Sequence, residues 1–134
     1  MKYLLLLLAV LPIASFTFIH SNQTEKNCVY FHTGSFGTGD KSVPEGYYIL
    51  ERNDSIQKEI IHGTNKWTTY KIKWTSDCEY TLDFIDCYPK SMVYMLPKKV
   101  KTKILETRGD SCFYHASGNG ASVKLWMVKL DKVQ

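Results

Sequence analysis

The chain has 134 residues, of which 22% are charged, and a formal net charge of +4. This mildly basic balance lacks the dense Lys and Arg clustering of a nucleic-acid-binding protein. The length leaves room for one domain with a single small core.

The N-terminal segment has the three-part order of a secretory signal peptide. Lys2 gives a positive start, the run LLLLLAVL over residues 4–11 is apolar, and small residues follow. A transmembrane helix needs about 20 apolar residues, and Pro12 interrupts this run earlier. We therefore expect residues 1–21 to be a cleaved signal peptide and residues 22–134 to form one β-barrel domain. The mature protein is expected to be periplasmic or extracellular, without a transmembrane anchor.

After the leader, short runs of alternating apolar and polar residues are separated by turn residues. Tyr, Trp, Val, Ile and Thr, which suit a pleated sheet, are frequent in these runs. In chain order, the predicted strands span residues 28–33, 47–52, 55–61, 67–75, 78–85, 92–96, 100–107, 111–116 and 122–130. The glycine-rich stretch 34–40 is interpreted as the turn that ends the first strand.

Sequential strands with short connections predict an antiparallel meander. No stretch of ten or more residues has a convincing helical period. An open sheet leaves its edge strands unpaired, whereas a barrel pairs all of them. We therefore expect an all-β fold, an up-and-down barrel of about eight strands with a lipocalin-like shape; a two-sheet sandwich is the alternative.

The most informative polar residues flank a predicted hairpin turn. A two-residue turn at 53–54 would place Tyr48 opposite Glu59. Because side chains alternate between the two faces of a strand, Arg52, Gln57 and Glu59 share one face with Tyr48.

If this face points into the barrel, its polar groups can orient one small ligand in an apolar lumen. The predicted ligand-binding residues are Arg52, Gln57, Glu59, Tyr48 and Tyr80. The opposite face of the hairpin could equally be the core. The polar residues would then form a solvated cross-strand ion pair, which contributes little to stability.

Four cysteines follow the leader: Cys28, Cys78, Cys87 and Cys112. In an oxidising compartment an even number suggests two disulfides, and three pairings are possible. We favour Cys28 with Cys78 and Cys87 with Cys112; buried free thiols are the alternative. The spacing lacks the C-x-x-C pairs of zinc or redox sites, so no metal site and no cofactor are predicted.

Three motifs are more specific than composition. They are Cys28-x-x-Phe31-x-x-Gly34-x-Phe36, Ile49-x-x-Arg52-x-x-x-x-Gln57-x-Glu59 and Trp74-x-x-x-Cys78-x-Tyr80-x-Leu82. This pattern resembles a family of small secreted proteins of Bacteroidota that are often mislabelled as DNA topoisomerase IV. The resemblance covers residues 28–82 well and the remainder loosely.

The resemblance implies a periplasmic or extracellular setting and supports the pairing of Cys28 with Cys78. The additional pair, Cys87 and Cys112, departs from what the family implies. No catalytic residue is carried over from it. The topoisomerase label does not suit an exported chain that has no room for nucleotide-binding and cleavage domains.

The chain carries no G-x-S-x-G, H-E-x-x-H or Gly-rich phosphate-binding motif, so no catalytic residue is assigned and the protein is not expected to be an enzyme. We expect a binding module for a small, apolar or amphipathic ligand. The alternative is a protein-interaction or inhibitor module that binds a periplasmic or extracellular protein through loops such as residues 34–46. Nucleic acid is not an expected partner.

Overall fold

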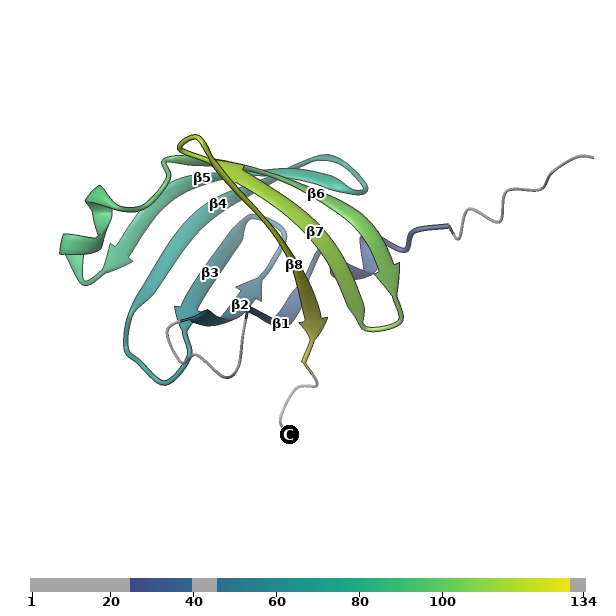
Figure 1. Cartoon of the computed structure of the whole chain (residues 1–134), viewed down its shortest axis with the longest axis horizontal. Coiled ribbons are helices and arrows are strands. Elements are labelled where there is room, and N and C mark those ends of the chain that lie inside the picture. The colour runs from purple at the N-terminus through teal and green to yellow at the C-terminus, as the bar shows by residue number, and fades with distance from the viewer. Residues whose placement is uncertain (1–24, 40–45, 131–134) are drawn as a thin grey trace, which may run out of the picture.

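The computed structural model describes residues 25–39 and 46–130, so the predicted signal peptide lies outside the described residues. The chain forms eight strands that close into an antiparallel barrel. Each strand pairs with the next one along the chain, and β8 returns to pair with β1 (Figure 1). The predicted all-β, up-and-down barrel is confirmed, and the alternative of a two-sheet sandwich is wrong.

The strands are β1 (Gly34–Gly39), β2 (Tyr47–Arg52), β3 (Ile56–Ile61), β4 (Trp67–Ser76), β5 (Glu79–Tyr88), β6 (Lys99–Arg108), β7 (Ser111–Gly118) and β8 (Ala121–Lys129). The short 3-10 helix η1 (Val29–Phe31) precedes β1, and the short 3-10 helix η3 (Lys90–Tyr94) follows β5. Strands β2 to β8 agree with the predicted ones to within three residues at each end.

The beginning of the barrel differs from the prediction. The predicted strand at 28–33 is the helix η1, and the glycine-rich stretch read as a turn is strand β1. These glycines allow close packing: a Cβ atom on Gly37 would lie 2.0 Å from the hydroxyl oxygen of Tyr47. Glycine occurs in this strand because the side chain of Tyr47 fills the space that a Cβ atom would need. In the sequence, the same glycines suggest a turn.

The predicted strand at 92–96 is also wrong, because this segment lies in and just after η3. The amide of Met92 donates to the carbonyl of Pro89, and the amide of Met95 donates to the carbonyl of Met92. Pro89 and Pro97 flank the segment. Proline has no amide hydrogen to donate to a sheet, so the segment forms a compact connection between β5 and β6.

The two short helices lie at opposite ends of the barrel (Figure 1). At the closed end, the Tyr30 hydroxyl of η1 donates to Asp110 over 2.6 Å, and Nε2 of His32 donates to the Asp77 carbonyl over 2.8 Å. At the other end, η3 follows β5, and Pro97, which lies after η3, closely approaches Gly118 at the end of β7. We call this second end the mouth.

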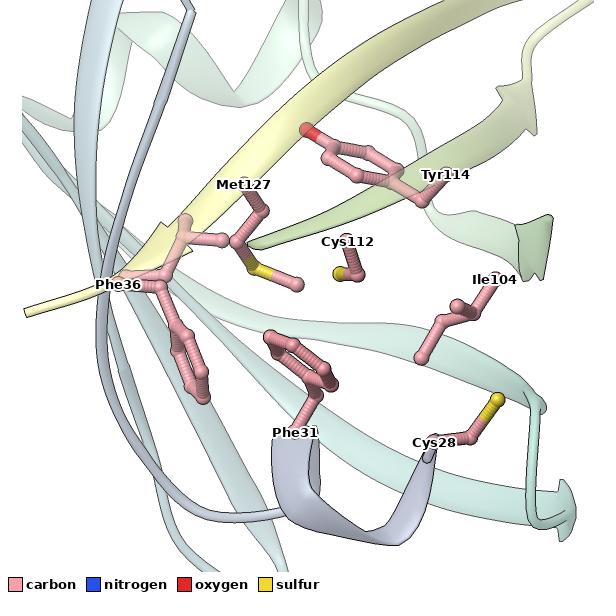
Figure 2. Packing of buried hydrophobic residues seen from close by; sticks show 8 residues of the cluster. Cys28, Phe31, Phe36, Ile104, Cys112, Tyr114 and Met127 are labelled. Carbon is pink, nitrogen blue, oxygen red and sulfur yellow. The ribbon is translucent and has the colours of Figure 1, made fainter. Parts of the chain in front are cut away.

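A cluster of buried side chains fills the closed end. It consists of Cys28, Phe31, Phe36, Leu50, Ile104, Cys112, Tyr114 and Met127. Figure 2 shows Phe31 rising from η1 into the middle of this cluster. Phe31 has no exposed surface, and burial of such a side chain contributes about 1.5–3 kcal/mol. The helix therefore acts as an apolar plug.

The predicted disulfide between Cys28 and Cys78 is confirmed, whereas the predicted pairing of Cys87 with Cys112 is wrong. Cys87 and Cys112 are free, buried thiols. Cys112 belongs to the cluster at the closed end, as does Cys28. Cys87 lies nine residues along β5 from Cys78, which at about 3.3 Å per residue is some 30 Å of strand. The two thiols lie toward opposite ends of the barrel and cannot meet.

Replacement of both Cys28 and Cys78 by serine is expected to lower the free energy of unfolding by about 4 kcal/mol, because a cross-link over 50 residues removes much entropy from the unfolded chain. Urea unfolding, with and without a reductant, measures this difference.

The serine variant should be insensitive to the reductant, and Cys87 and Cys112 should react with an alkylating reagent only after unfolding. Recovery of a peptide that links Cys87 to Cys112 from the native protein would contradict the structure.

Candidate functional site

The β2–β3 hairpin brings the predicted polar residues together with a corrected register. Arg52 pairs with Gln57, and Leu50 pairs with Glu59. The prediction had placed Tyr48 opposite Glu59, so the true register differs by two residues. An even shift keeps every side chain on its predicted face, which is why the shared face was predicted correctly although the pairs were not.

The side chain of Asn53 sets this register. Its Oδ1 accepts hydrogen bonds from the amides of Ser55 and Ile56, at 2.9 and 2.8 Å, while its own amide donates to the Ile56 carbonyl. The tight turn therefore has Asp54 and Ser55 at its centre, not Asn53 and Asp54. Asn side chains commonly bond to the backbone two residues further on.

Arg52 is a buried cation with neutral hydrogen-bond partners. Its Nε and Nη2 both donate to Oε1 of Gln57, at 2.9 and 2.6 Å. Nη1 donates to the Phe31 carbonyl over 2.7 Å, and Nη2 also donates to the Tyr80 hydroxyl over 2.9 Å. Arg52 is only 5% exposed, so these bonds take the place of water around the guanidinium.

Aromatic rings surround the same guanidinium. Its carbon lies 4.7 Å from the ring centroid of Tyr80, 5.2 Å from that of Phe36 and 5.7 Å from that of Trp74. Such contacts favour a cation in a desolvated place. Arg52 does not line the cavity described below; the structure places it behind Gln57, bound to the plug.

Gln57 connects Arg52 to Glu59. Because its amide oxygen accepts two hydrogen bonds from Arg52, its amide nitrogen must point the other way, and it donates to Oε1 of Glu59 over 2.7 Å. Burial raises the pKa of Glu59, while the hydrogen bond from Gln57 and the charge of Arg52 oppose that rise. Glu59 thus lies where the polar chain from the closed end meets the lumen.

A cavity of about 430 Å³ occupies the lumen between this polar chain and the mouth. Of the predicted ligand-binding residues, Gln57, Glu59, Tyr48 and Tyr80 line it, and Arg52 does not. Its volume falls within the range of about 300–1,000 Å³ that is typical of ligand pockets.

Several lining residues were not predicted as site residues. They are Thr38, Thr68, Tyr70, Thr102 and Tyr114 on the strands, and Met92, Met95, Leu96 and Pro97 at the mouth. Except for Thr38, which lies in the stretch predicted as a turn, the strand residues could have been found from alternation, since they share the inward face with buried neighbours. The mouth residues carried no such signal, because they lie outside the strands.

The tyrosines keep their hydroxyl groups neutral inside the lumen. Thr38 Oγ1 donates to the Trp126 carbonyl over 3.0 Å, which leaves it to accept the hydroxyl hydrogen of Tyr114 over 2.9 Å. Burial raises the pKa of Tyr114 and of Tyr70 above that of a free tyrosine. The wall of the cavity therefore offers neutral hydroxyl groups and aromatic surface.

Other groups in residues 25–39 and 46–130 give no sign of a metal centre. No three His, Cys, Asp or Glu side chains come together there in a way that could hold a metal ion. His32 stacks on Trp74 with ring centroids 3.5 Å apart, and His62 packs edge-on against Tyr47. No helix in these ranges is long and apolar enough to span a membrane.

Comparison of the chain with protein-family models, curated proteins and solved structures finds no match. The interpretation of the site therefore depends on its geometry.

Replacement of Arg52 by methionine is expected to lower the free energy of unfolding by about 3–5 kcal/mol, because it leaves Glu59 and Gln57 without their buried partner. Denaturant unfolding measures the loss.

Arg108 provides a control for this substitution, since its side chain is 69% exposed. Replacement of Arg108 by methionine should change the free energy of unfolding by about 0.5 kcal/mol or less. Equal effects of the two substitutions would show that the buried network is unimportant for stability.

The raised pKa of Glu59 predicts a specific pH dependence. Between its ordinary value of 4.5 and the higher value in the folded protein, the folded state binds more protons than the unfolded chain. The free energy of unfolding should therefore fall as pH rises through this window. A Glu59→Gln variant should lack this component. Unfolding of both proteins across a pH series measures it, and parallel curves would contradict the assignment.

Proposed function

We propose that this protein is a non-catalytic binding module that holds a small, partly apolar ligand in the barrel lumen. The observation that carries the proposal is the cavity, which is lined mainly by apolar and aromatic side chains. Among the described residues, its polar lining groups are neutral hydroxyl and amide groups and one carboxylate, that of Glu59, which lies beside Gln57 at the inner end. A few convergent polar groups in an apolar pocket are typical of small-molecule sites.

The arrangement of the two ends supports the same proposal. Phe31 and the cluster around it fill the closed end, so a ligand would enter at the mouth. There, Tyr94 is 92% exposed and Met95 is 76% exposed, and Met95 also lines the cavity. Methionine adapts its shape easily to different neighbours, which suits an entrance that must accept an apolar molecule.

The alternative, a protein-interaction or inhibitor module, is favoured by the same exposed residues of the mouth. In that case Tyr94 and Met95 would contact a protein partner. Of the predicted interaction loop, residues 34–39 form strand β1, and residues 40–45 lie outside the described residues. A lumen of this size has no role in such a module, so we place ligand binding first.

We further propose that the protein works in the periplasm or outside the cell. The disulfide between Cys28 and Cys78 supports this, because such bonds persist in oxidising compartments. The sequence of the leader supports it independently.

Blocking the lumen tests the proposed function. The probe is diphenylhexatriene, an apolar dye without a polar head that fluoresces when it leaves water. The wild-type protein should bind it, and an Ala116→Phe variant should bind it at least about tenfold more weakly, since Ala116 lines the cavity.

The neighbouring residue gives the matched control. His115 is not part of the cavity lining, and successive side chains of a strand point to opposite faces. A His115→Phe variant should therefore bind the dye like the wild type. No binding by the wild type, or equal binding by all three proteins, would contradict a ligand site in the lumen.

A further inference from the structure

The charged groups of the cavity restrict the chemistry of its ligand. Among the described residues that line it, Glu59 is the one carboxylate, and none is Lys, Arg or His. Oε1 of Glu59 accepts the hydrogen bond from Gln57. Within the described part of the chain, Oε2 receives no hydrogen bond from the protein. This oxygen is therefore an acceptor that can carry negative charge in a wall whose other polar groups are neutral.

Two opposing effects act on the form of Glu59 that a ligand meets: burial raises its pKa, whereas the hydrogen bond from Gln57 and the charge of Arg52 favour the carboxylate. Among the residues that the structure describes, the hydrogen-bond partners of Arg52 are neutral: the Phe31 carbonyl, the Gln57 amide and the Tyr80 hydroxyl. A ligand that fills the lumen displaces water, and a buried cation without a counter-charge is strongly unfavourable. Ionised Glu59, joined to Arg52 through Gln57, supplies that counter-charge.

An ionised carboxylate accepts hydrogen bonds and donates none. We propose that the ligand is an apolar molecule whose polar head donates a hydrogen bond to Oε2 of Glu59, as an alcohol or an amine does. This inference rests on the proposed function, since it concerns the same cavity. A carboxylate head is rejected, because it would place a second negative charge beside Glu59 with no lumen-facing cation to balance it.

The groups around Glu59 fit a donor head. Arg52 and Gln57 approach from the closed end, and Tyr70 and Tyr114 interact electrostatically with Glu59 from β4 and β7. Both tyrosines are neutral, so they do not replace Arg52 as counter-charge. An ammonium head would also meet the aromatic rings of the wall. Alcohol and amine heads both donate a hydrogen bond, and the probes described next distinguish between them.

Four probes with eight carbon atoms and different heads test the inference: 1-octanol, octylamine, 2-octanone and octanoate. Each displaces diphenylhexatriene from the wild-type protein at neutral pH. We expect octanol, octylamine or both to have an affinity at least about ten times that of 2-octanone and octanoate. The latter two provide no hydrogen-bond donor to Glu59. The stronger of the first two identifies the head as an alcohol or an amine.

A Glu59→Gln variant should change this ranking. Its amide oxygen can keep the hydrogen bond from Gln57, which turns its amide nitrogen toward the lumen as a donor. The preference for octanol or octylamine over 2-octanone should fall about tenfold or more. Glu79→Gln is the control, since Glu79 pairs with Lys103 and is not part of the lining; it should keep the wild-type ranking.

The outcomes separate this inference from the proposed function. If diphenylhexatriene does not bind in the lumen of the wild type, the proposed function itself fails. If the dye binds but octanoate or 2-octanone competes as well as the donor heads, or if no probe competes, the inference alone is overturned. The wild-type ranking decides this even if Glu59→Gln does not fold.

Discussion

At the closed end of the barrel, the guanidinium of Arg52 donates to the carbonyl of Phe31 on one side and to the amide of Gln57 on the other. One buried cation thus fixes two unrelated parts of the molecule. It holds the plug helix in place, and it orients Gln57 so that the Gln57 amide nitrogen faces Glu59. The same set of hydrogen bonds therefore holds η1 at the closed end and orients the polar side chains at the inner end of the cavity.

Much of the fold could be predicted from alternation and turn residues. Strands β2 to β8 follow from these signals, because each has an inward face that must be apolar and an outward face that can be polar. Three predicted segments were wrong: the strand at 28–33, the turn at 34–40 and the strand at 92–96. The first and the third contain apolar residues for a reason other than strand alternation. Phe31 closes one end of the barrel and Met95 lines the other, and neither role leaves a periodic pattern.

The site was predicted in part, because faces are easier to infer than contacts. The shared face of Gln57, Glu59 and Tyr48 was predicted correctly, because side chains keep their face when the register is wrong by an even number of residues. The sequence left open which face points inward, and in the structure it is this one. The position of Arg52 behind Gln57 could not be inferred, because it depends on the helix that replaced the first predicted strand. The pairing of Cys87 with Cys112, favoured over free thiols, was wrong for a similar reason: the distance between the two residues is a property of the closed barrel.

Closure of the barrel depends on its last strand. β8 pairs with β1 at Phe36, Gly37 and Thr38, opposite Lys129, Val128 and Met127. About ninety residues separate the partners, and pairing over such a separation is slow because a long loop must close first. Until β8 arrives, β1 and β7 are open edges that can pair with another chain. During folding, the pairing of the final strand thus ends the period in which the protein is prone to aggregation.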